Sequence, residues 1–296
     1  MVEICEVGPR DGLQNESALL SVEDRVEMIR QLIDCGLKKI EAVSFVNPKV
    51  VPQMANPEEV MMQVPRVPGV RYAGLVLSAK GMDRALVAGV DDIHLVLAAS
   101  TTFNLKNARR TREESLAELA PLIAEANSAG RPVNAIIGTA FGCPFEGDVP
   151  ADIVLSTAET FLAAGAQALT LADTTGMANP AQVASMVELV QRQFPNVPLG
   201  LHFHNTRGLG LANVLAGYQA GVRRFDASTG GLGGCPFAPL SVGNVCTEDV
   251  IHMFHQMGIP TGVNLEQLLA STAFTQEKVG HDLHSYVVRA GAASHR

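Results

Sequence analysis

The chain has 296 residues, of which 47% are hydrophobic and 18% are charged, and its formal net charge is -8 at pH 7. This composition excludes a disordered chain, and the length allows either two ordinary domains or one large α/β barrel. The negative charge argues against nonspecific binding of nucleic acid and against an anionic membrane surface as a partner. It does not exclude a small anionic ligand, which needs only a local basic site.

No apolar run reaches the ~18 residues that a membrane span requires. The first residues enter an apolar run directly, so we predict neither a signal peptide nor a transit segment. The five cysteines are scattered and lack CxxC spacing, which is typical of reduced thiols in the cytosol. We therefore expect a cytoplasmic protein.

Short apolar runs alternate with longer helical patterns from end to end. The predicted strands are, in chain order, Val2–Val7, Lys39–Phe45, Arg71–Leu77, Asp92–Ala98, Val133–Ala140, Ala168–Ala172, Leu199–His204 and Arg224–Ala227. The predicted helices lie near Val22–Cys35, Pro57–Met62, Lys80–Ala88, Arg112–Ala129, Pro150–Ala164, Pro180–Gln193 and Leu209–Ala220, and a further one starts near Asn244.

Eight strands that alternate with helices predict a (β/α)8 TIM barrel. A doubly wound open sheet is the alternative. The stretch Val263–Lys278 looks like an additional helix. We therefore expect a single domain, with the barrel over about residues 1–258 and a C-terminal helical extension over about residues 259–296.

The unusual polar residues follow the predicted strands. In such a barrel, active residues lie at the C-terminal ends of the strands and in the loops beyond them. The residues at these places are Arg10, Asp11 and Gln14, then Glu41 and Ser44, then Asp173, then His202 and His204, and finally Asn244. Burial of the strands on both faces does not require polar residues at these positions. We therefore predict that the site lies at this rim of the barrel.

The segment His202-Phe203-His204 is the sharpest indication of a metal. Residues two apart on a strand point to the same side, so both imidazoles would enter the barrel mouth. The alternative is a pair of hydrogen-bonded core histidines. Asp11 and Asn244 are the best oxygen ligands to complete the set, which suits Mg²⁺ or Mn²⁺ without excluding Zn²⁺.

Two basic features suggest contacts with an anion. Arg10 could form a surface ion pair with Asp11, but its place after a Gly-Pro turn favours stabilisation of an oxyanion. Lys106 and Asn107 precede three arginines, and this cluster could be a solvated helix start or could bind the phosphorylated tail of a cofactor.

The segment Gly230–Phe237 holds four glycines in five residues. It could be a flexible turn, or it could fold over the barrel mouth as a lid. In the second case Cys235 is a candidate proton shuttle and Gly233 a candidate substrate contact. The spacing does not match a P-loop or a dinucleotide fingerprint.

Taken together, these residues resemble the family of 3-hydroxy-3-methylglutaryl-CoA (HMG-CoA) lyases, which is related to the isopropylmalate and homocitrate synthases. The resemblance covers nearly the whole chain. Its motifs are Glu6–Glu16 (EVGPRDGLQNE), Ser44–Met54 (SFVNPKVVPQM), Gly142–Gly147 (GCPFEG), Gly200–Gly208 (GLHFHNTRG), Gly231–Pro236 (GLGGCP) and Gly243–Asp249 (GNVCTED).

The resemblance implies a TIM barrel that splits (S)-HMG-CoA into acetyl-CoA and acetoacetate, a reaction of leucine degradation. It implies a divalent cation on Asp11, His202, His204 and Asn244, with Arg10 as the catalytic arginine and Cys235 as the lid cysteine. Glu41 and Asp173 match acidic site residues. An acyl-CoA substrate and a homodimer or higher oligomer are the implied partners. We expect catalytic roles for His202, Glu41 and Asp11, and substrate contacts from Gln14, Ser44, Lys106, Asn107, Asp173 and Gly233.

The chain departs from the family pattern near the acyl group. Val51 replaces a common tryptophan, Thr101-Thr102 replaces a usual Ser-Glu, and Leu240 and Val242 are bulkier than the usual residues. A different 3-hydroxy-3-alkyl acyl-CoA is therefore an alternative substrate. The sequence is also compatible with a Claisen condensing enzyme of the isopropylmalate or homocitrate synthase type, or with a non-catalytic metal-stabilised barrel.

Overall fold

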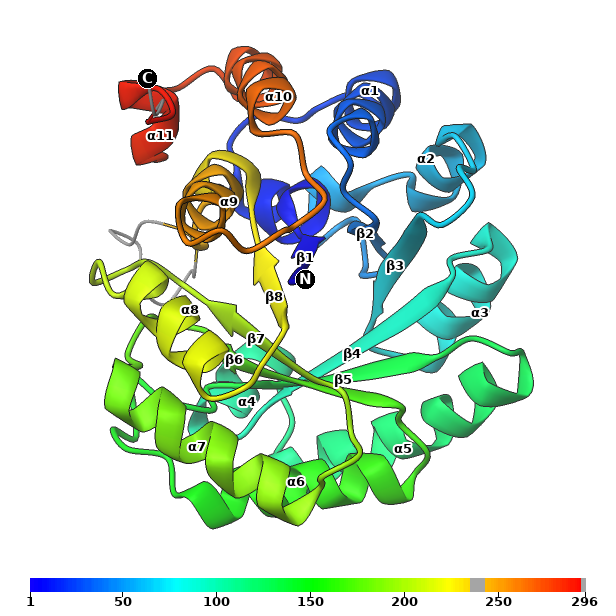
Figure 1. Ribbon diagram of the computed structural model, residues 1–296. Coiled ribbons are helices and arrows are strands. Elements are labelled where there is room, and N and C mark those ends of the chain that lie inside the picture. The colour runs from blue at the N-terminus through cyan, green and yellow to red at the C-terminus, as the bar shows by residue number, and fades with distance from the viewer. Residues whose placement is uncertain (235–242, 294–296) are drawn as a thin grey trace.

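Eight parallel strands close into a barrel, and the helices between them form an outer ring (Figure 1). The computed structural model describes residues 1–234 and 243–293. The strands are β1 (Glu3–Glu6), β2 (Lys39–Ser44), β3 (Arg71–Val76), β4 (Asp92–Ala98), β5 (Val133–Gly138), β6 (Ala168–Asp173), β7 (Leu199–Phe203) and β8 (Arg224–Ala227). All eight predicted strands are confirmed.

The barrel is closed by pairing of β8 with β1, in which Glu3 lies opposite Arg224 and Glu6 opposite Ala227. This closure confirms the (β/α)8 prediction and shows that the alternative of an open doubly wound sheet is wrong. Because all strands are parallel, their C-terminal ends meet at one rim.

The predicted connecting helices are all present. They are α1 (Val22–Asp34), α2 (Pro57–Gln63), α3 (Ala79–Ala88), α5 (Arg112–Ser128), α6 (Ala151–Ala163), α7 (Pro180–Gln193), α8 (Gly210–Gln219) and α9 (Thr247–Gln256). Side-chain caps mark the starts of α1, α3, α5 and α7: Ser21 accepts a hydrogen bond from the backbone of Asp24 at α1, and Thr111 forms a capping box with Glu114 at α5.

One helix was not predicted. Helix α4 (Thr101–Ala108) is only eight residues long and contains Lys106 and Asn107, which the sequence indicated only as a basic cluster. The side chain of Ser100 accepts from the backbone of Phe103 at its start, and Arg109 ends it in the left-handed region with a φ of 58°. This helix follows β4 and so lies at the rim of the barrel.

The C-terminal extension is helical, as predicted. It contains α10 (Leu265–Val279) and a short helix that was not predicted, α11 (Tyr286–Ala290). Helix α10 lies beside α1 (Figure 1), where the Lys278 ammonium is 2.8 Å from a carboxylate oxygen of Asp24. The single-domain organisation stays a prediction.

The strands are buried on both faces, as their continuous apolar runs predict. Every residue of β2, β5, β6 and β7 is buried. Among the described residues, no helix combines the length and the apolar character needed to span a bilayer.

Candidate active site

A tight turn after β1 brings Arg10 and Asp11 to the barrel mouth. The chain forms a π-helical turn over Gly8–Gly12. The amide of Gly8 donates to a carboxylate oxygen of Glu6 over 2.7 Å, and a Cβ at Gly8 would lie 2.6 Å from that oxygen. A side chain at this position would push the Glu6 carboxylate away, so glycine allows this close approach of the backbone amide. Glu6 thus supports the turn that carries Arg10 and Asp11.

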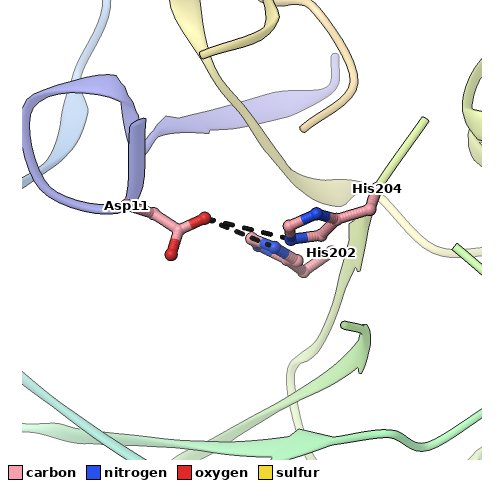
Figure 2. Close-up of side chains that lie close together, drawn as sticks. All are labelled: Asp11, His202 and His204. Atoms are coloured by element: carbon pink, nitrogen blue, oxygen red, sulfur yellow. Dashed lines mark ion pairs between the residues drawn. The ribbon is translucent and has the colours of Figure 1, made fainter. Parts of the chain in front are cut away.

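Asp11 faces the two histidines of β7 and the loop beyond it (Figure 2). Its Oδ2 lies 3.9 Å from Nε2 of His202 and 4.0 Å from Nε2 of His204. The same oxygen accepts a hydrogen bond of 2.7 Å from Nδ2 of Asn244. His204 and Asn244 form an antiparallel β-bridge, which explains why a residue after β8 reaches the end of β7. We call these four residues the metal corner.

The metal corner fits a divalent cation. Atoms bound to one such ion at about 2.0–2.3 Å cannot lie more than about 4.6 Å apart, and the separations from Asp11 meet this limit. Oδ1 of Asn244 is buried and has no hydrogen-bond partner among the described residues, so it is free to coordinate. Imidazole, carboxylate and amide groups are ligands that Mg²⁺, Mn²⁺ or Zn²⁺ accept.

Burial and local charge keep Asp11 and His204 in the states that coordination requires. Burial alone would raise the pKa of Asp11, but the positive charge of Arg10 and the nearby histidines lower it to about 2. Burial and the neighbouring His202 lower the pKa of His204 to about 4. At neutral pH Asp11 is therefore ionised and His204 is neutral.

Arg10 is held by carboxylates on two sides. Its Nη1 donates to Oδ1 of Asp11 over 2.7 Å and its Nε donates to Oε2 of Glu41 over 2.6 Å. Burial would lower the pKa of Arg10, but Glu41 and Asp11 raise it above its ordinary value. Gln14, a predicted substrate contact, donates to the same oxygen of Asp11 over 2.7 Å and so helps to orient this carboxylate.

Two site residues were missed from the sequence. His94 on β4 places Nδ1 2.8 Å from Oε1 of Glu41, and Asp226 on β8 places Oδ2 3.2 Å from Nδ1 of His202. A carboxylate behind a metal-binding histidine orients the ring and strengthens its basicity. The sequence signal that could have identified both residues is a titratable side chain within an otherwise apolar strand.

A cavity of about 430 Å³ opens beside the metal corner. Its polar side includes Arg10, Asp11, Gln14, His202 and His204. The other side is apolar, and we call it the apolar wall; it is formed by Phe45, Val46, Val50, Val51, Leu75, Leu77, Val96, Phe103, Ile136 and Ala172. The cavity therefore brings reactive and apolar surfaces together, as ligand sites usually do.

The predicted substrate contacts divide into two groups. Asn107 lines the cavity, and Lys106 is exposed on the same helix, with its ammonium 4.8 Å from the centre of the Phe145 ring. Ser44 and Asp173 are described residues that are not among those lining the cavity. Asp173 instead accepts backbone hydrogen bonds of 2.7 and 3.1 Å from the loop after β6, and burial raises its pKa to about 6.

The glycine-rich segment is described as far as residue 234. Gly233 has a φ of +106°, and a Cβ there would lie 2.6 Å from Nδ2 of Asn244. Its contact is thus with the metal corner, and a substrate contact stays a prediction. Cys235, Leu240 and Val242 lie outside the described residues.

The chain is similar to known proteins over nearly its whole length. The HMGL-like family model matches residues 1–274. The chain belongs to the HMG-CoA lyase family. It is 44% identical to the hydroxymethylglutaryl-CoA lyase YngG of Bacillus subtilis, with 96% of this chain and 95% of that protein covered. It is 42% identical to the (R)-citramalyl-CoA lyase of Chloroflexus aurantiacus, with 98% and 95% covered.

A solved structure supports the same family. An HMG-CoA lyase from Acinetobacter baumannii, in complex with coenzyme A and 3-methylmalate, superposes with a TM-score of 0.95 at 43% identity and covers 100% of this chain and 97% of that one. As a member of this family, the present chain is an enzyme of the carbon–carbon lyase type. The lyase names of the relatives disfavour the condensing-enzyme and non-catalytic alternatives.

Proposed function

We propose that this lyase cleaves (S)-HMG-CoA into acetyl-CoA and acetoacetate and depends on Mg²⁺ or Mn²⁺. The observation that carries the proposal is the convergence of the metal corner and Arg10 at one end of the cavity. The relationship to YngG, which is named a hydroxymethylglutaryl-CoA lyase, supports it.

The reaction can be assigned to the residues of this chain. A cation held by the metal corner would act as a Lewis acid and lower the pKa of the C3 hydroxyl of the substrate. Asp11 or a neighbouring histidine is the candidate base for the hydroxyl proton. When the C2–C3 bond breaks in a retro-Claisen step, the electron pair moves to the thioester oxygen, where the guanidinium of Arg10 stabilises it. Protonation at C2 gives acetyl-CoA, and Cys235 is the candidate donor.

The coenzyme A portion would leave the cavity past α4. Asn107 lines the cavity on this helix, and the exposed Lys106 is adjacent to it. A cation and an amide at the entrance suit the phosphates and amides of that portion. The related HMG-CoA lyase structure from A. baumannii is a complex with coenzyme A.

The direct test is incubation of the purified protein with HMG-CoA and Mg²⁺ or Mn²⁺, followed by assays for acetyl-CoA and acetoacetate. We expect both products in equal amounts. We also expect that chelation of the metal abolishes turnover and that either cation restores it. Turnover that survives verified metal removal would contradict the metal dependence, and absence of both products would contradict the substrate.

A second candidate is the same chemistry on a different 3-hydroxy-3-alkyl acyl-CoA. The apolar wall supports it, because Val51 stands where the family commonly has tryptophan and lines the cavity. The 42% sequence identity to an enzyme named (R)-citramalyl-CoA lyase also supports this second candidate. Comparing kcat/KM for a panel of acyl-CoAs with different C3 substituents ranks the candidates.

We also propose a homodimer or higher oligomer and a cytoplasmic location. Light scattering during size-exclusion chromatography measures the oligomeric state.

A further inference from the structure

We infer that His94 is a positioning residue for the reaction: it fixes the carboxylate of Glu41, which in turn fixes the guanidinium of Arg10. This inference deepens the proposed function and rests on the role given there to Arg10. His94 itself is 1% exposed and is not among the described residues that line the cavity. It therefore acts through Glu41 and does not touch the substrate.

The first support is the position of the pair inside the barrel. Glu41 on β2 lies in register with Ala73 of β3, and His94 on β4 lies in register with Leu75 of the same strand. The two side chains are thus separated by a whole strand. They can come within 2.8 Å of each other only because both point into the barrel interior.

The second support is how the carboxylate oxygens are used. Oε1 of Glu41 pairs with Nδ1 of His94, and Oε2 accepts from Nε of Arg10 over 2.6 Å. Nη2 of Arg10 also contacts Oε2. Rotation of this carboxylate would break one set of contacts or the other. The hydrogen bond from His94 therefore fixes the plane of the Glu41 carboxylate, to which the guanidinium of Arg10 binds.

The third support is the tautomer that this contact demands. An ionised carboxylate only accepts hydrogen bonds, so Nδ1 of His94 carries the proton. Nε2 is buried and has no hydrogen-bond partner among the described residues. The ring borders a cavity of about 10 Å³ shared with Asn134, Thr170 and Asp226, which is about the room for one water. The contact with Glu41 is thus the one protein hydrogen bond identified for this imidazole within the described chain.

The consequence for catalysis concerns geometry. Arg10 must meet the thioester oxygen as its charge develops, and a displacement of about 1 Å costs about a hundredfold in rate. Without a donor at Oε1, the carboxylate of Glu41 is free to turn, and Arg10 loses its fixed orientation. Asp11 keeps its hydrogen bonds from Gln14 and Asn244 whichever way Arg10 turns, so we expect the affinity for the metal to change little.

The test compares three substitutions at one position. His94→Leu removes the donor. His94→Asn keeps a nitrogen donor near the place of Nδ1, and His94→Gln carries the same amide with its nitrogen near the place of Nε2. Thr170→Val is the matched control, because it removes a buried polar group from the same interior without touching Glu41.

The first readout is kinetic. We expect His94→Leu to lower kcat for HMG-CoA by about tenfold to a hundredfold, with KM and the Mn²⁺ dissociation constant unchanged within about twofold. His94→Asn should recover most of kcat, and Thr170→Val should be close to wild type. If His94→Leu does not fold, the contrast between Asn and Gln takes its place.

The second readout does not need turnover. Hydrogen exchange of the Nε–H of Arg10, followed by NMR and assigned through its loss in Arg10→Lys, should speed up in His94→Leu or His94→Gln and stay slow in His94→Asn. Absence of HMG-CoA cleavage by the wild type would defeat the proposed function alone, and this exchange would still decide the positioning role. Unchanged kcat and exchange in His94→Leu, or equal loss in the Asn and Leu variants, would overturn the inference.

Discussion

The metal corner and the apolar wall form two sides of one cavity but are built in opposite ways. In the metal corner, Asp11 accepts hydrogen bonds on both oxygens and is buried to 8% exposure. In the apolar wall, Val50 is 75% exposed and Val51 is half-buried. A hydrogen-bonded corner tolerates little change, whereas the part of the wall at Val50 and Val51 is open enough to accept other side chains. We conclude that the metal corner determines the reaction and that the apolar wall determines which substrates are accepted.

The largest effect is expected at Arg10. Arg10→Gln removes the charge that stabilises the enolate oxygen, so kcat should fall by several orders of magnitude, about a thousandfold or more. The fold should persist, because Glu41 keeps its contact with His94 and the glutamine amide retains a donor. Steady-state kinetics with circular dichroism and thermal unfolding measure both. Turnover near that of the wild type would remove the reason to assign the reaction to this side of the cavity.

The next effect is expected behind the metal corner. Asp226→Asn weakens the orientation of His202, so affinity for Mn²⁺ should fall by about tenfold to a hundredfold. Electron paramagnetic resonance of free Mn²⁺ measures this affinity without any turnover. Asp92→Asn is the matched control, since Asp92 is also a buried barrel carboxylate but pairs with Arg71 and Lys39. Equal losses in both variants would mean that general destabilisation accounts for the effect.

The apolar wall should respond with selectivity. Val51→Trp fills part of the cavity, so kcat/KM for acyl-CoAs with large C3 substituents should fall relative to HMG-CoA by about tenfold to two-hundredfold. Val50→Trp is the matched control, because this neighbour also lines the cavity but is mostly exposed. If Val51→Trp lowered kcat for all substrates alike, the division between corner and wall would fail.

The extent to which the sequence predicted this site follows from periodicity. Alternation of short apolar runs with helices identifies every strand, and spacing by two identifies His202 and His204 as one face. Neighbouring residues at the end of β6 show the limit. Ala172 lines the cavity, while Asp173 holds the following loop. A shift of one residue reverses the face of a strand, and the sequence does not fix that register.

Long-range pairing accounts for the residues that were missed. His94 is flanked by Ile93 and Leu95, and nothing in this run tells whether the imidazole meets Glu41 inside the barrel or a helix outside it. Asp226 reaches His202 because the two residues lie side by side in the register of β7 and β8. Helix α4 was missed because its first turn has neither the proline nor the acidic residues that mark the start of the similarly short α2.

The smallest effect is expected at a support outside the metal corner. Nε2 of His281 lies 2.7 Å from a carboxylate oxygen of Glu16, which ties the C-terminal segment to the motif that contains Arg10 and Asp11. The hydrogen bond from this contact raises the pKa of His281 above its ordinary value. The added stability is therefore fully present below the unfolded pKa of about 6.5 and is lost as the pH rises through the higher folded pKa.

The substitution that tests this tie is His281→Gln. The imidazole is 44% exposed, so we expect the free energy of unfolding to fall by only about 0.2–0.5 kcal/mol at about pH 5.5 and by nothing measurable at about pH 8.5. Urea unfolding at both pH values measures this loss of stability. Glu16→Gln should remove the same pH-dependent part of the free energy of unfolding. A loss of kcat in His281→Gln would show that the corner depends on this outer support, whereas unchanged kcat would confirm that its own hydrogen bonds suffice.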